Sequence, residues 1–281
     1  MTERVKVAPE QTFNFEGAKL NYRIVGQGSP VVLLHGSMVA DLWNGFEKQL
    51  GKYYRVYLPE LPGFGASEAV EGKIHNMELF ARAFAAFVKR AGLESVPIIA
   101  FSLGTTVAIK AAGQGEIGGR LILVGMPVRL ESKLLERIMQ MPVPARRILA
   151  KSELARGGIL LSILKDVIGT ADSGFAIQYL KLLRTSDVRA MVDVDPITDV
   201  EKDMPWYLGR LKNRMDFIYG EKDKLRDGAE KFLGRKIRIV AGAGHDIFVS
   251  KPKDSLNLLR EMLDEQSSRW ERVKQWWLRP I

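Results

Sequence analysis

The sequence predicts an α/β fold in which a doubly wound, mostly parallel sheet carries helices on both faces. Short unbroken apolar runs recur along the chain, and amphipathic helical patterns alternate with them. Continuous apolarity over strand length is typical of strands covered on both faces, as in a parallel sheet. The apolar runs are residues 31–34, 56–58, 96–101, 121–124, 215–219 and 237–240. Strand–helix alternation of this kind is characteristic of doubly wound sheets.

A β-hairpin is predicted ahead of these strands, over residues 11–25. Phe13 and Phe15 alternate with polar residues, Glu16-Gly17 marks a turn, and the alternation then resumes. The clearest helical pattern covers residues 77–91, where apolar residues recur at the spacing of one helix face.

The alternation stops after residue 126. From 127 to 205 the chain shows only helical stripes, at residues 130–138, 159–168 and 175–183. We interpret 127–205 as a helical cap, or lid, inserted into a core formed by residues 1–126 and 206–265. A separately folding helical domain is the alternative, and the short length of the segment disfavours it.

The composition limits which classes of protein this chain can belong to. With 46% hydrophobic and 27% charged residues, the chain is expected to be globular. It contains no cysteine, which excludes disulfides and a thiolate nucleophile. No signal-peptide pattern and no apolar run of spanning length is present, so a soluble cytoplasmic protein is expected. The net charge is +9, but Lys and Arg are scattered among Asp and Glu, so no nucleic-acid partner is expected.

Ser102 is the candidate nucleophile. It follows the apolar run 98–101 in a small-X-Ser-X-Gly turn formed with Ala100 and Gly104, and a helical pattern starts directly after it. Such a sharp strand–turn–helix junction needs small residues on both sides of the serine. It lifts the hydroxyl out of the sheet and aims a helix N-terminus at it. The alternative is that Ser102 only caps the helix.

A serine nucleophile needs a base, and the chain offers three histidines. His245 follows the apolar run 237–240 within a Gly-Ala-Gly-His-Asp loop, at the sheet edge where α/β proteins place ligands. His35, at the exit of the run 31–34, is expected to be structural. His75 precedes a surface-type helix and is expected to be solvated. His245 is therefore the predicted base.

Asp223 is the predicted orienting acid. It follows the apolar run 215–219 and precedes His245 with room for one helix and one strand. A carboxylate in this role fixes the tautomer of the histidine and stabilises its imidazolium. The rival carboxylates are Glu221, Asp227 and Asp216. Asp223 is favoured because Ser, Asp, His is the chain order of this constellation on an α/β sheet.

An oxyanion hole completes the predicted machinery. The strand exit at Leu34-His35-Gly36 leads to Ser37, whose backbone N–H (or that of Met38) is expected to pair with that of Leu103. Two main-chain donors of this kind suffice to hold a tetrahedral oxyanion.

Together these segments resemble the α/β-hydrolase superfamily, in its lid-bearing serine esterase-like branch. The matching motifs are Leu33-Leu34-His35-Gly36, Leu61-Pro62-Gly63-Phe64-Gly65-Ala66-Ser67, Ala100-Phe101-Ser102-Leu103-Gly104, Gly220-Glu221-Lys222-Asp223 and Gly242-Ala243-Gly244-His245. Two positions depart from the family pattern: Ala100 stands where Gly is usual, and Glu60 stands where Asp is usual.

The resemblance implies an eight-stranded α/β-hydrolase fold and hydrolysis through an acyl-enzyme, with no cofactor and no metal. The expected function is a carboxylesterase-type serine hydrolase acting on small to medium apolar esters. A C–C bond hydrolase or a thioesterase with the same triad is the alternative within the enzymes. A non-catalytic hydrolase-fold binding protein is the alternative outside them.

Residues 266–281 form an unusual basic, Trp-rich extension. Trp270, Val273, Trp276 and Trp277 fall on one helical face, with Arg and Lys elsewhere. The pattern is typical of a peripheral membrane helix. It also fits a helix that packs on the body of this protein or on a second copy in a homodimer, and this second interpretation is favoured.

Overall fold

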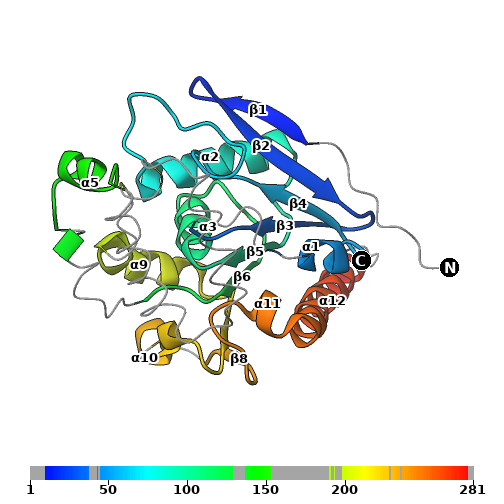
Figure 1. Ribbon diagram of the computed structural model, residues 1–281. Helices are drawn as coiled ribbons and strands as arrows, with labels where there is room; N and C mark the ends of the chain where they lie inside the picture. The colour runs from blue at the N-terminus through cyan, green and yellow to red at the C-terminus, as the bar shows by residue number, and fades with distance from the viewer. Residues whose placement is uncertain are drawn as a thin grey trace.

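The computed structural model describes residues 10–37, 43, 45–128, 137–138, 140–152, 190, 193, 198–227, 229–234 and 236–277, with backbone alone at 198–203 and 265–277. Within these residues one eight-stranded sheet runs in the order β1-β2-β4-β3-β5-β6-β7-β8 (Figure 1). The strands are β1 (Gln11–Phe15), β2 (Ala18–Val25), β3 (Pro30–Leu34), β4 (Arg55–Pro59), β5 (Ile98–Phe101), β6 (Leu121–Val124), β7 (Met215–Gly220) and β8 (Arg238–Val240). β2 pairs antiparallel with β1 and β4, and every other pair is parallel. The predicted fold class is confirmed.

The predicted hairpin is formed by β1 and β2. Glu16 and Gly17 connect them with φ angles of 49° and 87°, the left-handed pair that a tight two-residue hairpin turn requires. The Gly17 N–H donates to the side chain of Asn14 at 3.2 Å, which closes the turn.

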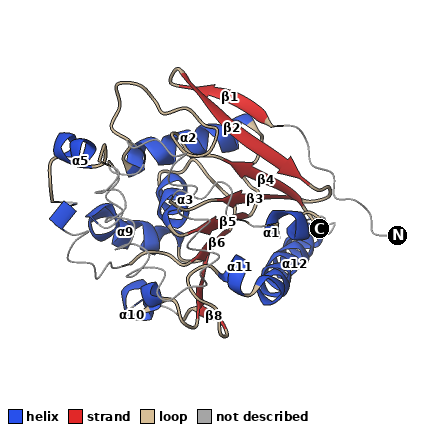
Figure 2. Ribbon diagram, in the orientation of Figure 1, coloured by secondary structure: helices blue, strands red, loops and turns tan. Residues whose placement is uncertain are grey.

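Helices cover both faces of the sheet (Figure 2). On one face lie α2 (Met77–Arg90), α3 (Leu103–Gly113) and α9 (Thr198–Leu211), and on the other lie α1 (Phe46–Leu50), α11 (Ile247–Ser250) and α12 (Pro252–Trp277). The strands divide their side chains between these two cores. In β3, Val32 and Leu34 enter one core, while Val31 and Leu33 enter the other. The unbroken apolar runs of the sequence follow from this two-sided burial.

The helical pattern at residues 77–91 is confirmed as α2. Asn76 caps its first turn by accepting a hydrogen bond from the Leu79 N–H at 2.9 Å. The predicted apolar stripe, including Phe80, Phe84 and Phe87, is buried against the sheet. This packing holds α2 against the sheet.

Between β6 and β7 the described elements are the helices α5 (Val143–Leu149) and α9. The predicted helical stripes at 130–138, 159–168 and 175–183 lie wholly or mostly outside the described residues, so the cap stays a prediction. The boundary expected after residue 205 falls inside α9. Met204, Tyr207 and Leu211 of this helix are buried in the core that contains α3.

α12 continues without a break from Pro252 to Trp277. The predicted Trp-rich extension therefore prolongs the last helix of the core as far as Trp277, although its side chains lie outside the described residues. Tyr54 donates a hydrogen bond to Asp264 at 2.9 Å and joins this helix to the chain between α1 and β4. Within the described part of the chain, no helix has the length and apolarity needed to cross a membrane.

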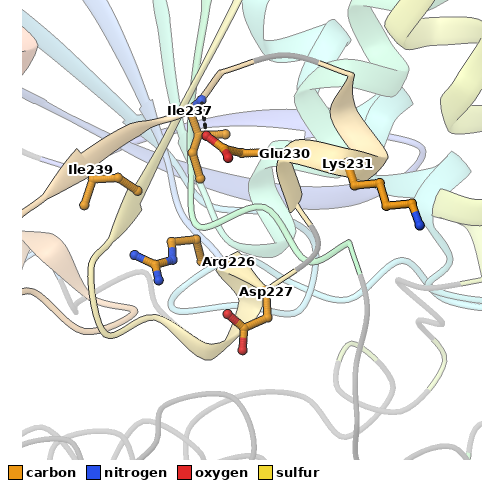
Figure 3. A pocket seen from close by; sticks show the side chains of 6 residues that line it. All are labelled: Arg226, Asp227, Glu230, Lys231, Ile237 and Ile239. Carbon is orange, nitrogen blue, oxygen red and sulfur yellow. Dashed lines mark hydrogen bonds between the residues drawn. The ribbon is translucent and has the colours of Figure 1, made fainter.

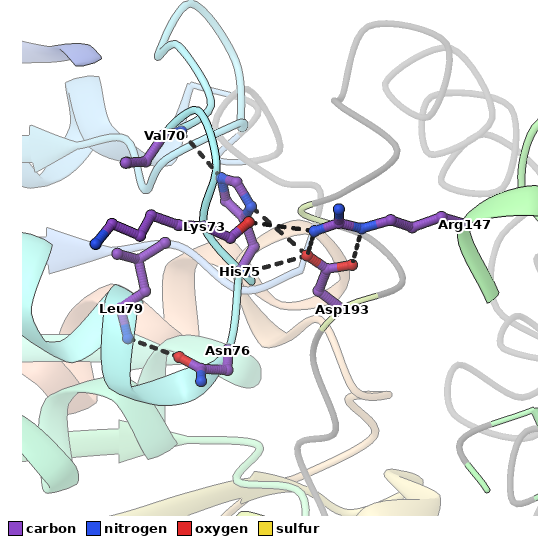
Figure 4. Close-up of polar contacts among 7 residues, drawn as sticks. All are labelled: Val70, Lys73, His75, Asn76, Leu79, Arg147 and Asp193. Carbon is purple, nitrogen blue, oxygen red and sulfur yellow. Dashed lines mark hydrogen bonds and ion pairs between the residues drawn. The ribbon is translucent and has the colours of Figure 1, made fainter. Parts of the chain in front are cut away.

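The prediction that His75 is solvated is wrong. Its side chain is fully buried, and its Nε2 accepts a hydrogen bond from the Val70 N–H at 3.1 Å (Figure 4). The His75 N–H donates to Asp193 at 2.9 Å, and Asp193 also binds the guanidinium of Arg147 through both carboxylate oxygens. The sequence could not reveal this burial, because Asp193 and Arg147 come from the segment between β6 and β7.

Asp193 thus clamps α5 onto the loop before α2. Burial alone would raise the pKa of Asp193, but the hydrogen bonds from Arg147 and from the His75 backbone, with the charges of both residues, hold that pKa below its usual value. The ionised carboxylate therefore stabilises the folded state above the pKa that Asp193 has when unfolded, and this contribution is lost in acid.

We expect Asp193→Ala to lower the free energy of unfolding by about 2–3 kcal/mol near neutral pH, because it leaves the Arg147 guanidinium without its carboxylate. Urea denaturation of both proteins measures the difference, which should shrink as the pH falls through the pKa of Asp193. Glu116→Ala, which removes an exposed carboxylate, is the matched control and should stay within about 0.5 kcal/mol of wild type. Equal loss in the two variants would contradict the clamp.

Candidate active site

Ser102 lies in the sharp turn that joins β5 to α3, with φ 50° and ψ −122°. Glu16 is the other non-glycine residue with positive φ in the described part of the chain. The Ser102 N–H donates to the Val124 carbonyl at 2.8 Å, and its own carbonyl accepts from the Thr105 hydroxyl at 2.6 Å. A backbone in this region costs about 1–3 kcal/mol. This conformation is the one that presents a nucleophilic hydroxyl at the top of an α/β sheet.

The small residues around Ser102 are required by close packing. Ala100 is fully buried in β5. A Cβ on Gly104 would lie 2.3 Å from the carbonyl oxygen of His35, so any larger residue would push α3 off the end of β3. The alternative in which Ser102 serves as a capping residue finds no support, because its side chain makes no hydrogen bond to the helix N-terminus.

His245 and Asp223 come together as a hydrogen-bonded pair. His245 lies in the loop after β8, and its Nδ1 is 3.0 Å from an Asp223 carboxylate oxygen. Both side chains are buried, with 5% and 3% of their residue surfaces exposed. The other carboxylate oxygen of Asp223 accepts a hydrogen bond from the Leu225 N–H at 2.9 Å, which fixes the acid at the end of β7. With Nδ1 engaged in this way, Nε2 is the ring nitrogen left to act as a base.

The three rival carboxylates make other contacts. Glu221 accepts a hydrogen bond from the Gly242 N–H at 2.7 Å, and Asp216 pairs with Arg120 at 2.6 Å. Asp227 lines a surface hollow of about 410 Å³ beside β8 (Figure 3). That hollow contains none of the predicted site residues, and its lining mixes both signs of charge with Ile237 and Ile239.

Two carboxylates act on the charge of His245. Burial alone would lower the pKa of its imidazole, but the charge and hydrogen bond of Asp223, with the charge of Asp246, raise that pKa above its usual value. Burial in turn raises the pKa of Asp246 to about 6. Asp246 caps α11 by accepting hydrogen bonds from the Phe248 and Val249 N–H groups at 3.0 and 3.1 Å. Its position is therefore fixed next to the base.

An aromatic cluster supports the same imidazole. The Phe101 ring lies 5.0 Å from the His245 ring, centroid to centroid, and 5.5 Å from the ring of Phe248. Phe248 packs in turn on Trp43 and Phe46, at 5.2 and 4.8 Å. Because Phe101 immediately precedes Ser102, the cluster connects the strand that carries the serine to the loop that carries the histidine.

Gly125 provides the space that His245 occupies. It follows β6 with φ +60°, and a Cβ there would lie 2.7 Å from the His245 Cε1 and 3.4 Å from an Asp223 carboxylate oxygen. The Ser102 N–H is bonded to Val124, the residue directly before Gly125. The predicted serine, acid and histidine are thus gathered at the carboxyl ends of β5, β7 and β8, on either side of the end of β6.

The two predicted oxyanion donors lie at neighbouring positions. Ser37 follows the exit of β3, and Leu103 is the first residue of α3. N–H groups in the first turn of a helix have no acceptor within that helix. A Cβ on Gly36 would lie 2.8 Å from the Ser102 Cβ, so the chain leading to Ser37 passes directly beside the serine. Met38, the alternative donor, lies outside the described residues.

Sequence reasoning missed Asp246 and Gly125. Asp246 follows the predicted base directly, yet adjacency alone did not show that it is buried and caps a helix. Gly125 directly follows a buried strand, and a glycine at that position was a readable signal of close approach. The contact of Gly125 with His245 joins residues far apart in the chain, whereas the cap that Asp246 provides to α11 is local.

Residues 31–257 match the sequence profile of the Alpha/beta hydrolase family. This match covers the segments that contain Ser102, Asp223 and His245. It also covers both predicted oxyanion donors.

Two curated relatives with named activities match over shorter stretches. The chain is 36% identical over 88 residues to a pimeloyl-[acyl-carrier protein] methyl ester esterase of Aeromonas salmonicida, a match covering 31% of this chain and 33% of the relative. It is 32% identical over 124 residues to a 2-hydroxy-6-oxo-6-phenylhexa-2,4-dienoate hydrolase of Burkholderia cepacia, covering 41% and 43%. These matches therefore span less than half of either relative.

The whole fold is shared with solved structures. An esterase, RhEst1, from Rhodococcus sp. ECU1013 superposes with a TM-score of 0.67 over 93% of this chain and 98% of that chain, at 19% identity. Similarity at this level of identity shows the common fold.

We expect Gly125→Ala to lower kcat about a hundredfold, because the added methyl group displaces the His245 ring and misplacement of a catalytic group by about 1 Å has an effect of this size. Gly115→Ala is the matched control, since Gly115 also has positive φ (+90°) but nothing lies near its Cβ position. Both variants carry the same kind of backbone strain. Ester hydrolysis and thermal unfolding of the two proteins separate strain from displacement, and equal kcat values would contradict this role of Gly125.

We expect Asp246→Asn to shift the acid limb of the kcat/KM profile to lower pH. The amide oxygen still caps α11, but the charge that helps to raise the pKa of His245 is gone. A histidine can act as a base only when it is neutral, so a lower pKa would keep His245, the predicted base, active in more acidic solution. Asp254→Asn, which neutralises an exposed carboxylate on α12, is the control. An acid limb at the same pH in wild type and Asp246→Asn would show that Asp246 does not act on the base.

Proposed function

The chain belongs to the alpha/beta hydrolase family, and from this premise we propose that it is a serine hydrolase of the carboxylesterase type. The observation that supports the proposal most is the buried His245–Asp223 pair, held at the same edge of the sheet as the strained serine turn. The substrates we propose are small to medium carboxylic esters with an apolar acyl group, hydrolysed through an acyl-enzyme.

The proposed reaction begins with Ser102. Its oxygen attacks the ester carbonyl while Nε2 of His245 takes the hydroxyl proton, and Asp223 stabilises the imidazolium from the Nδ1 side. The negative charge that develops on the carbonyl oxygen is held by the backbone N–H groups of Ser37 and Leu103.

Collapse of the tetrahedral intermediate breaks the ester C–O bond. The imidazolium of His245 gives its proton to the leaving alcohol, and the acyl group stays on Ser102. Water then attacks this acyl-enzyme, with His245 again taking a proton and returning it to the serine oxygen. The products are the carboxylic acid and the alcohol, and the enzyme regains its starting protonation.

A C–C bond hydrolase is the second candidate. The local similarity to the 2-hydroxy-6-oxo-6-phenylhexa-2,4-dienoate hydrolase is the observation that favours it. The same serine, base and acid are compatible with both reactions, and fold alone does not select a substrate. Lid residues 127–205, which we propose to line the acyl pocket, lie largely outside the described part of the chain.

We expect wild type to hydrolyse p-nitrophenyl esters with a preference for acyl chains longer than acetyl. Ser102→Ala should lower kcat by about 10⁴-fold or more and should abolish labelling by a fluorophosphonate probe, because both reactions need the serine oxygen. Ser29→Ala, at an exposed serine, is the control and should keep full activity. Activity that survives in Ser102→Ala, or a wild type inert toward every ester and the probe, would overturn the esterase proposal. A flat chain-length profile would contradict a shaped acyl pocket.

A further inference from the structure

His35 makes two hydrogen bonds that define its protonation. The ring Nδ1 lies 2.7 Å from the Gly36 carbonyl oxygen, and the Leu61 N–H donates to Nε2 at 2.9 Å. A carbonyl oxygen can only accept, and a backbone N–H can only donate. His35 must therefore be neutral, with its proton on Nδ1. Only 1% of the residue surface is exposed, so water does not compete for either bond.

The bond from Nδ1 fixes the orientation of one peptide group. The carbonyl of Gly36 and the N–H of Ser37 belong to the same peptide unit, and no cis peptide bond occurs among the described residues. In a trans peptide the C=O and N–H bonds point in opposite directions. By holding the Gly36 carbonyl on its own side, His35 directs the Ser37 N–H away from its ring. Gly36 itself packs closely against Ser102, since a Cβ on Gly36 would lie 2.8 Å from the Ser102 Cβ.

The residues that contact His35 lie in a turn held by hydrogen bonds of its own. Leu61 begins a turn in which its carbonyl accepts from the Phe64 N–H at 3.0 Å, and the Phe64 ring packs on the His35 ring at 5.3 Å. Glu60 braces this turn, since its carboxylate accepts from the Ala66 N–H at 2.7 Å. The departure from the family pattern at Glu60 thus keeps an acidic side chain that holds the turn.

We propose that His35 is a positioning residue for the oxyanion hole: its Nδ1–H locks the Gly36–Ser37 peptide so that the Ser37 N–H faces the reacting carbonyl oxygen. This inference rests on the proposed serine-hydrolase function. A donor fixed before the reaction stabilises the developing oxyanion without having to reorient, so its effect falls on kcat and not on substrate binding.

Two substitutions separate the two hydrogen bonds of His35. The amide nitrogen of asparagine is attached to Cγ, as Nδ1 is, so His35→Asn keeps the donor to Gly36 and loses the acceptor for Leu61. The amide oxygen of glutamine reaches the position of Nε2, so His35→Gln keeps the acceptor for Leu61 and loses the donor to Gly36. Each variant removes one buried hydrogen bond, and we expect similar drops in thermal stability.

We expect kcat to fall about a hundredfold in His35→Gln and less than about tenfold in His35→Asn, with KM little changed in both. The rate of phosphonylation by a fluorophosphonate should follow kcat, because the phosphoryl oxygen occupies the same hole. Equal kcat values in the two variants, or a lower value in His35→Asn, would overturn the proposal, since a purely structural role would make activity follow stability.

A measurement on the wild type covers the case in which neither variant folds. Nitrogen NMR of isotope-labelled histidine, with each ring assigned to its residue through the backbone signals, should show the His35 imidazole neutral and protonated on Nδ1. Protonation of the His35 ring on Nε2 would overturn the inference. If the wild type itself neither hydrolyses esters nor takes the probe, the proposed function fails and the role of His35 fails with it. If the wild type is active and the two variants are equal, only the role of His35 fails.

Discussion

The parallel pairing of β3, β5, β6 and β7 is the constraint on which the rest of the structure depends. Parallel strands in register end at one edge, so the loops that follow them must share a small volume. That crowding explains why Gly36, Gly104 and Gly125 stand where they do: a Cβ at any of them would lie within 3 Å of an atom from a neighbouring strand end or loop. Close approach of backbones brings Ser102, Asp223 and His245 to one edge without help from long side chains.

The electrostatics of the site follow from burial at this edge. Burial alone would lower the pKa of His245, yet two fixed carboxylates raise that pKa above its usual value. Asp223 acts through a direct hydrogen bond, and Asp246 acts through its charge while it caps α11. An imidazolium that forms here is therefore stabilised by groups that need not move.

The sequence predicted those features that depend on local patterns. The strands show as apolar runs, the hairpin as Glu16-Gly17, and α2 as an apolar stripe behind Asn76, and the structure confirms all three. The family is confirmed by the match of residues 31–257 to its sequence profile. The pairing of Asp223 with His245 was also foreseeable, from chain order. His75 was misjudged because its burial depends on Asp193, a partner more than a hundred residues away that no periodicity connects to it. The close contact between Gly125 and the His245 ring escaped prediction for the same reason. To predict it, one must know that the loop after β8 lies over the end of β6.

The backbone of Ser102 carries a consequence for how such a protein evolves. Glycine adopts φ near 50° without strain, so a glycine at this position would relieve about 1–3 kcal/mol that serine must sustain. Selection for stability alone would favour losing the hydroxyl. The chain therefore holds a residue that opposes its own folding at the point where the sheet is most crowded, and stability and reactivity compete at this single position.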